Sequence, residues 1–139
     1  MVLKLEWTPK ISVNNEKVDN QHKKLFLIIN KLATIKKEKA EPDAIFEVLR
    51  ELIDYSDKHF KAEGLYLSEN DYPLPLFKAH LGEHEDYFGK MEKFVEDYGK
   101  GRETLTDEIL KFLAGWWVEH VSESDMKYAR YVRYVNSKK

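Results

Sequence analysis

The chain has 139 residues, of which 42% are hydrophobic and 35% charged, with 6 Gly and 4 Pro. This length fits one domain, and the composition is that of a soluble globular protein. Lys and Arg total 23 against 25 Asp and Glu, so we expect no nucleic-acid partner. Residues 1–6 lack a secretory apolar run and no segment resembles a membrane span, so we expect a cytoplasmic protein without membrane contact. Because the chain has no cysteine, histidines and carboxylates are its only strong metal ligands.

Apolar residues recur at three- and four-residue steps in four segments, as is typical of amphipathic helices. Pro73 and Gly99 mark breaks between these segments. The predicted elements are an arm over residues 1–18 with a buried Trp7, helices over 19–38, 42–69, 74–98 and 104–121, and a short C-terminal helix over 125–135. Short connections predict an all-α fold with a single domain over 1–139: an up-down-up-down antiparallel four-helix bundle with an extended N-terminal arm.

All five histidines of the chain fall on the apolar faces of these predicted helices. A single histidine in such a place is most often an ordinary hydrogen-bonded core residue. Five in one small core would cost about 1–3 kcal/mol for each polar group left unsatisfied. A bound metal would satisfy them together, and the candidate ligands are His22, His59, His80, His84 and His120.

Two carboxylates complete this pattern. Glu63 follows His59 by one helical turn, so both side chains project the same way. Asp125 follows His120 by five residues and shares its face only if the helix loosens there. Taken alone, each acid would more often lie in solvent. Seven ligands exceed the needs of one tetrahedral zinc ion, whereas two six-coordinate ions bridged by both carboxylates and a solvent oxygen use them all and keep one open position. Imidazole with carboxylate suits iron, and an open position on a ferrous pair would accept dioxygen.

The sequence resembles the hemerythrin family, specifically the stand-alone bacterial hemerythrins, from Trp7 to Asp125. Each motif alone is a weak signal, but their order and spacing together are highly specific. The motifs are Asp19-Asn20-Gln21-His22, His59-Phe60-Lys61-Ala62-Glu63, Tyr72-Pro73, His80-Leu81-Gly82-Glu83-His84 and Trp116-Trp117-Val118-Glu119-His120.

The resemblance implies a non-haem di-iron centre with an oxo or hydroxo bridge, which binds dioxygen reversibly and is not an enzyme. It implies that one iron is held by His80, His84 and His120, that the iron with the open position is held by His22 and His59, and that Glu63 and Asp125 bridge the two. The implied wall of the dioxygen pocket is Leu25, Phe60, Trp116, Trp117 and Val121, which would equally be ordinary core residues. We expect a monomer that carries, stores or senses dioxygen, or delivers it to an oxygen-using partner protein.

Two positions depart from the family pattern. Trp117 stands where a smaller aliphatic residue is usual, which narrows the pocket unless the ring turns elsewhere, and Gly64 stands where a second acid often follows the glutamate. One alternative function is a ferritin-like di-iron oxidase or peroxide-handling enzyme, but its Glu-x-x-His motif is absent. Another is a nitric oxide or redox sensor that signals to a partner, and because it would use the same site, the sequence leaves it open.

Overall fold

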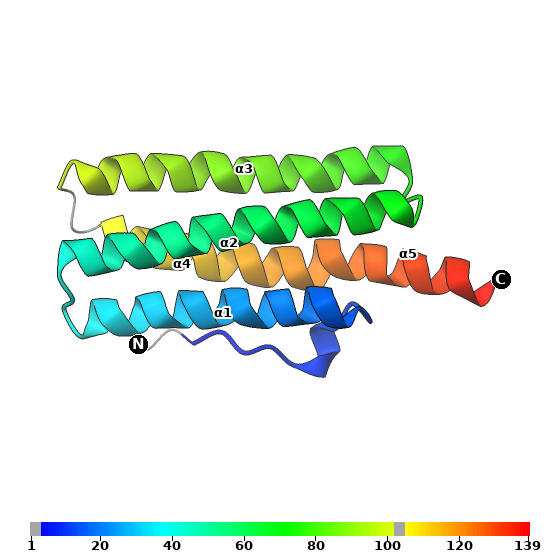
Figure 1. Cartoon of the computed structure of the whole chain (residues 1–139), viewed down its shortest axis with the longest axis horizontal. Coiled ribbons are helices and arrows are strands. Elements are labelled where there is room, and N and C mark those ends of the chain that lie inside the picture. The colour runs from blue at the N-terminus through cyan, green and yellow to red at the C-terminus, as the bar shows by residue number, and fades with distance from the viewer. Residues whose placement is uncertain (1–3, 102–104) are drawn as a thin grey trace.

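The computed structural model describes residues 4–101 and 105–139, and every regular element within them is helical (Figure 1). These elements are a short 3-10 turn (Pro9–Ile11), α1 (Glu16–Lys37), α2 (Pro42–Glu69), α3 (Leu74–Gly99), α4 (Leu105–Glu119), a π-helical segment (His120–Asp125) and α5 (Met126–Ser137). The first four α-helices alternate in direction, and α1 and α3 each contact both α2 and α4. This arrangement confirms the predicted all-α, up-down-up-down antiparallel four-helix bundle.

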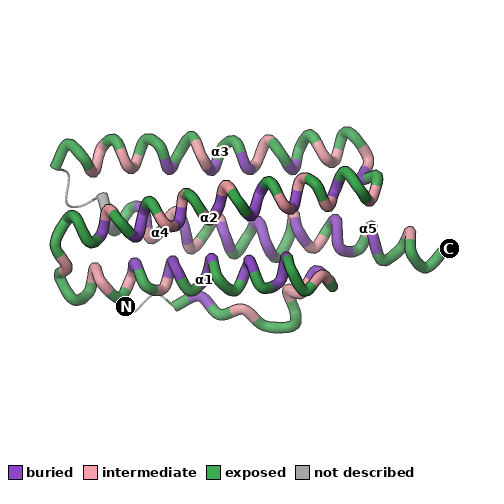
Figure 2. Tube along the Cα trace, viewed as in Figure 1, coloured by how far each residue is buried: buried purple, intermediate pink, exposed green. Residues whose placement is uncertain are grey.

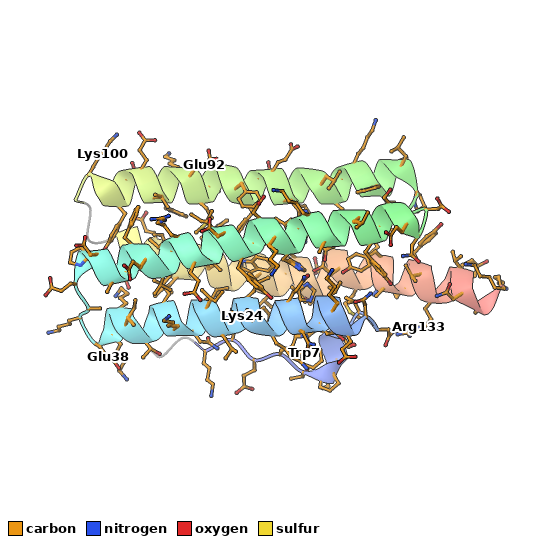
Figure 3. The ribbon with its side chains drawn as sticks, in the orientation of Figure 1. Trp7, Lys24, Glu38, Glu92, Lys100 and Arg133 are labelled. Atoms are coloured by element: carbon orange, nitrogen blue, oxygen red, sulfur yellow. The ribbon has the colours of Figure 1, made fainter. Side chains whose placement is uncertain are left out.

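The core of the bundle is built from the apolar stripes of its helices. Leu25, Ile29 and Leu32 of α1 have no exposed surface, and neither do Leu49 and Leu52 of α2. Buried positions therefore repeat along the inward side of each helix, as Figure 2 shows. Charged side chains cover the outside of the bundle (Figure 3). Among the described residues, no helix is both long and apolar enough to cross a membrane.

Most of the described helix ends agree with the prediction within two residues, and two differences stand out. The first helix begins three residues earlier than expected, because the side chain of Asn15 accepts a hydrogen bond from the N–H of Val18 and caps it. The fourth and C-terminal helices, predicted to end at residue 121 and to start at residue 125, are joined without a break by the π-helical segment. The expected start of the fourth helix at residue 104 lies outside the described residues.

The N-terminal arm lies along α1, but Trp7 is not its buried anchor. Leu5 is buried instead, and the side chain of Asn30 bonds to its backbone N–H at 2.7 Å and its carbonyl at 2.9 Å. Trp7 is half-buried, with the Nζ of Lys23 above its ring at 4.4 Å from the ring centre. Trp7 packs against the core but keeps part of its surface exposed, so the prediction that it is buried holds only in part.

The π-helical segment places His120 and Asp125 in the interior. A π-helical turn closes its hydrogen bonds over five residues instead of four, so residues five apart come onto one face. The loosening that the His120–Asp125 spacing predicts is therefore confirmed. Figure 1 shows the result: α5 continues from α4 and extends beyond the ends of the other helices.

Candidate metal centre

Seven chemically reactive side chains meet in the middle of the bundle. They come from three α-helices and the π-helical segment that follows α4, and none is more than 4% exposed. They are His22 of α1, His59 and Glu63 of α2, His80 and His84 of α3, and His120 and Asp125 of the π-helical segment. The structure thus brings together every side chain that the sequence singles out as a candidate ligand.

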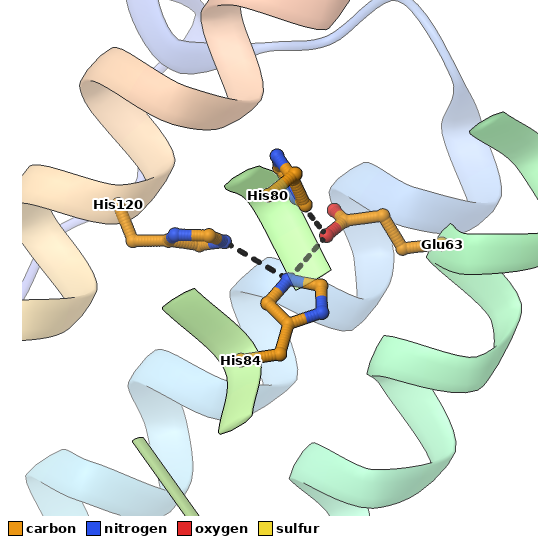
Figure 4. A group of neighbouring side chains, drawn as sticks. All are labelled: Glu63, His80, His84 and His120. Atoms are coloured by element: carbon orange, nitrogen blue, oxygen red, sulfur yellow. Dashed lines mark hydrogen bonds and ion pairs between the residues drawn. The ribbon is translucent and has the colours of Figure 1, made fainter. Parts of the chain in front are cut away.

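These side chains form two groups that share Glu63. In one, ligand atoms of Glu63, His80, His84 and His120 lie within 4.8 Å of one another, and Figure 4 shows the imidazoles pointing toward the carboxylate. We call this the three-histidine group. In the other, the two-histidine group, ligand atoms of His22, His59, Glu63 and Asp125 meet the same limit.

Glu63 turns one oxygen toward each group. Its Oε1 lies 2.8 Å from Nε2 of His80 and 3.1 Å from Nε2 of His84. Its Oε2 lies 3.6 Å from Nε2 of His59 and 3.8 Å from Nε2 of His22. A carboxylate in this orientation can bridge two metal ions.

Asp125 is arranged in the same way. Its Oδ1 lies 3.1 Å from Nε2 of His120 and 3.2 Å from Nε2 of His80, both in the three-histidine group. Its Oδ2 lies 3.1 Å from Nε2 of His22 in the two-histidine group. None of these contacts has the direction of a hydrogen bond, so both oxygens have room for another partner.

The site leaves several buried polar atoms without hydrogen-bond partners, and a pair of metal ions would satisfy them. Buried polar atoms are normally hydrogen-bonded, yet six atoms of this site have no such partner among the described residues. They are both ring nitrogens of His22, Nε2 of His59, Nδ1 of His84 and both oxygens of Asp125. In addition, Nε2 of His84 and Nε2 of His120 face each other at 3.2 Å. Imidazoles and carboxylates directed at two common points are the ligand set of a di-metal site.

The sequence analysis did not identify three residues that form hydrogen bonds with the candidate ligands. Gln21 Oε1 accepts the Nδ1–H of His59 at 2.7 Å, and Glu83 Oε1 accepts that of His120 at 2.9 Å, when each ring keeps Nε2 free for a metal. The hydroxyl of Tyr128 donates to Glu63 Oε2 at 2.8 Å. All three lie within three residues of a candidate ligand, but that signal does not show which helix each side chain faces.

Charge in the site is shared between imidazoles and carboxylates. Burial lowers the pKa of His22 and His80, but contacts with Asp125 and Glu63 outweigh it and raise each pKa to about 9. Burial likewise opposes the carboxylates that raise the pKa of His120 to about 10. Burial raises the pKa of Glu63, but the surrounding imidazoles dominate and hold it well below its usual value.

The pKa values of the remaining two histidines are lowered instead of raised. Burial lowers the pKa of His59 to about 3, and it also lowers that of His84. At pH 7, the imidazoles of His22, His80 and His120 in the metal-free protein are therefore in their charged, doubly protonated form, whereas those of His59 and His84 are neutral.

Metal binding should release these protons. A metal must displace the protons on His22, His80 and His120, so we expect about three protons per chain to appear in solution at pH 7 when Zn²⁺ is added. Affinity should rise with pH until these groups lose their protons near pH 9–10. Calorimetric titration in buffers of different ionisation enthalpy measures the count. Release of no proton would show that the imidazoles are already neutral.

The five predicted pocket-wall residues lie in or beside this core. Leu25, Phe60, Trp117 and Val121 are buried, and Trp116 is partly buried. The Trp117 ring stacks on Phe60 at 5.6 Å between centres and lies 6.1 Å from the ring of His59. Trp117 thus points inward and lies near both groups, because its ring is also 6.4 Å from that of His120 in the three-histidine group. A Cβ added at Gly64 would meet nothing within 4 Å, so the missing acid there does not alter the packing of the site.

The Trp116 ring stacks on His120 at 4.4 Å, and Phe60 stacks on His84 at 3.7 Å. Both of these histidines belong to the three-histidine group, and the Phe60 ring also lies 5.6 Å from that of His59, so aromatic rings border both groups.

Comparisons with known proteins agree with this geometry. The profile of the family described as "Hemerythrin HHE cation binding domain" matches residues 13–132. The chain is 32% identical over 126 residues to a protein named bacteriohemerythrin from Clostridium acetobutylicum, covering 88% of this chain and 96% of that protein. It is also 32% identical over 123 residues to a hemerythrin-like protein from Naegleria gruberi, covering 88% of each.

Solved structures give the same result. A crystal structure of wild-type hemerythrin superposes with a TM-score of 0.81 at 28% identity, covering 91% of this chain and 95% of that one. A single-substitution mutant of hemerythrin superposes with a TM-score of 0.82 at 28% identity, covering 94% and 97%. With its paired His/Glu/Asp groups in the same four-helix architecture, the chain belongs to the hemerythrin family.

Proposed function

We propose that this protein binds dioxygen reversibly at two iron ions held by the seven clustered side chains. The observation that carries the proposal is that Glu63 and Asp125 each direct one oxygen to each group, while the histidines divide three to two. An ion in the two-histidine group therefore has one protein ligand fewer than its neighbour. A ferrous pair supplies the electrons that dioxygen takes up when it binds.

The ligand set and its surroundings favour binding over turnover. Five neutral imidazoles and two carboxylates place little negative charge on the metals, which disfavours the high-valent states that an oxidase needs. Trp117, Phe60 and Val121 are buried beside the site, where their apolar side chains would keep water and protons away from it. Tyr128 holds Glu63 by a hydrogen bond at Oε2.

We further propose that the chain acts as one domain, as a monomer in the cytoplasm, with an oxygen-using protein as the recipient of the dioxygen. The bacteriohemerythrin names of several relatives support an oxygen-related role for the family centre.

The test is a cycle of oxygenation on protein loaded with Fe²⁺ under anaerobic conditions. We expect two iron ions per chain, a coloured form when oxygen is admitted and the return of the colourless form when oxygen is removed under argon. Steady oxygen consumption with release of peroxide, or turnover of an added reductant, would instead identify an oxidase. One tightly held zinc ion and no iron uptake would overturn the proposal.

Trp117 should control how fast small ligands reach the site. Trp117→Leu removes a ring that lies 6.1 Å from the His59 ring, so azide should bind the ferric protein several-fold faster. The free energy of unfolding should fall by about 1–3 kcal/mol, as for other large-to-small core changes. Stopped-flow absorbance gives the rate, and Phe112→Leu is the control that should leave it unchanged, because this partly buried ring of the same helix packs against Tyr87 and Phe94. A loss of stability with no change in azide rate would show that Trp117 serves packing alone.

A further inference from the structure

Glu83 joins α3 to the segment that carries two of the candidate ligands. A single oxygen, Oε1, accepts the Nδ1–H of His120 at 2.9 Å and the hydroxyl of Ser124 at 2.6 Å. His120 and Ser124 lie near opposite ends of the π-helical segment. The His120 side chain is 1% exposed, whereas that of Glu83 is 43% exposed and lines an open pocket of about 600 Å³. One partly exposed carboxylate therefore holds both ends of a buried π-helical turn.

We propose that Glu83 is a positioning residue for the three-histidine group, acting on the metal through His120. A histidine binds a metal through one ring nitrogen only when the proton sits on the other. A carboxylate that accepts the Nδ1–H fixes the proton there, orients the ring and makes Nε2 a stronger donor. The bond from Ser124 to the same oxygen holds the π-helical turn in the shape that directs Asp125 into the site. The inference rests on the proposed metal centre.

Three other histidines, His22, His59 and His84, lack this arrangement. His59 donates its Nδ1–H to the neutral amide of Gln21, and the buried Nδ1 atoms of His22 and His84 have no hydrogen-bond partner among the described residues. The charge-assisted bond is thus confined to the three-histidine group. Glu83 therefore makes the two metal positions unequal, with the ion bound by His120 held more tightly.

The experiment compares the release of two Zn²⁺ ions from wild-type and variant protein to an excess of chelator, so it needs neither iron nor dioxygen. Glu83→Gln keeps an acceptor oxygen but removes the charge. It should speed the release of one ion about tenfold or more and leave the other within about twofold. Glu123→Gln is the matched control, because Glu123 lines the same pocket but makes no contact with a histidine among the described residues. It should release both ions at the wild-type rates.

Two further variants distinguish a positioning role of Glu83, exerted through His120, from a purely structural contact between α3 and the π-helical segment. Gln21→Leu should speed the release of the other ion, which assigns each kinetic phase to its group. Ser124→Ala should speed release less than Glu83→Gln and keep the ¹⁵N shifts of His120 in the Zn²⁺ form, whereas Glu83→Gln should move them.

Equal acceleration of both ions by Glu83→Gln, or rates that match those of Glu123→Gln, would overturn the inference, because a purely structural contact affects both ions alike. Wild-type protein that binds two Zn²⁺ ions but fails the oxygenation cycle would overturn the proposed function and leave this inference standing.

Discussion

Replacing Glu63 with glutamine is expected to abolish binding of the metal pair. Glu63 is the residue that the two groups share, with Oε1 2.8 Å from His80 and Oε2 3.6 Å from His59. The change keeps the size of the side chain but removes a buried charge that balances several imidazoles. Removal of one partner from a buried charge pair costs about 3–5 kcal/mol, so affinity should fall at least about a hundredfold.

Metal analysis of purified protein and titration with Zn²⁺ or Fe²⁺ measure this effect. Glu69→Gln, an exposed acid at the end of the same helix, is the control and should retain both ions. If Glu63→Gln still held two ions with unchanged affinity, a bridging role for Glu63 would be wrong.

Removal of the metals should lower the melting temperature of the wild-type protein by about 20 °C. Without metal, six buried polar atoms of the site lack hydrogen-bond partners among the described residues. Each ion present at a thousand times its dissociation constant adds about 4 kcal/mol to the free energy of unfolding. In a domain of this size each kcal/mol shifts the melting temperature by about 3 °C.

Circular dichroism melts with and without a chelator give this difference. The Glu63→Gln variant is an internal control, because its melting temperature should not respond to the chelator. Equal melting temperatures for wild-type protein with and without metal would show that the clustered side chains are stable by themselves.

The sequence predicts the bundle well because hydrophobic periodicity reports which side of each helix is buried. The same reasoning finds the five histidines, and the five-residue step from His120 to Asp125 even indicates the local change in helix type. Periodicity does not report how neighbouring helices are rotated against each other. The contacts of Glu83 with His120 and of Tyr128 with Glu63 depend on that rotation, so the pattern could not find them.

Trp7 shows a second limit of sequence reasoning. Hydrophobicity favours burial of the largest side chain in the arm, but the burial of Leu5 is decided by two hydrogen bonds to Asn30, which lies 25 residues away. Long-range polar contacts of this kind leave no local pattern.

The π-helical segment acts as a one-residue insertion in the continuous helix from Leu105 to Ser137. The buried positions after it are therefore offset by one residue from the α-helical periodicity of those before it. Buried positions before the offset include Leu113, Trp117 and His120, and those after it include Asp125, Tyr128 and Val132. Deletion of one residue between 121 and 124 would remove the offset and rotate α5 by about 100°. Asp125 would leave the site and Tyr128 would leave the core together. Ser122 and Glu123 are exposed and can change in identity, so what this stretch has to preserve is its length.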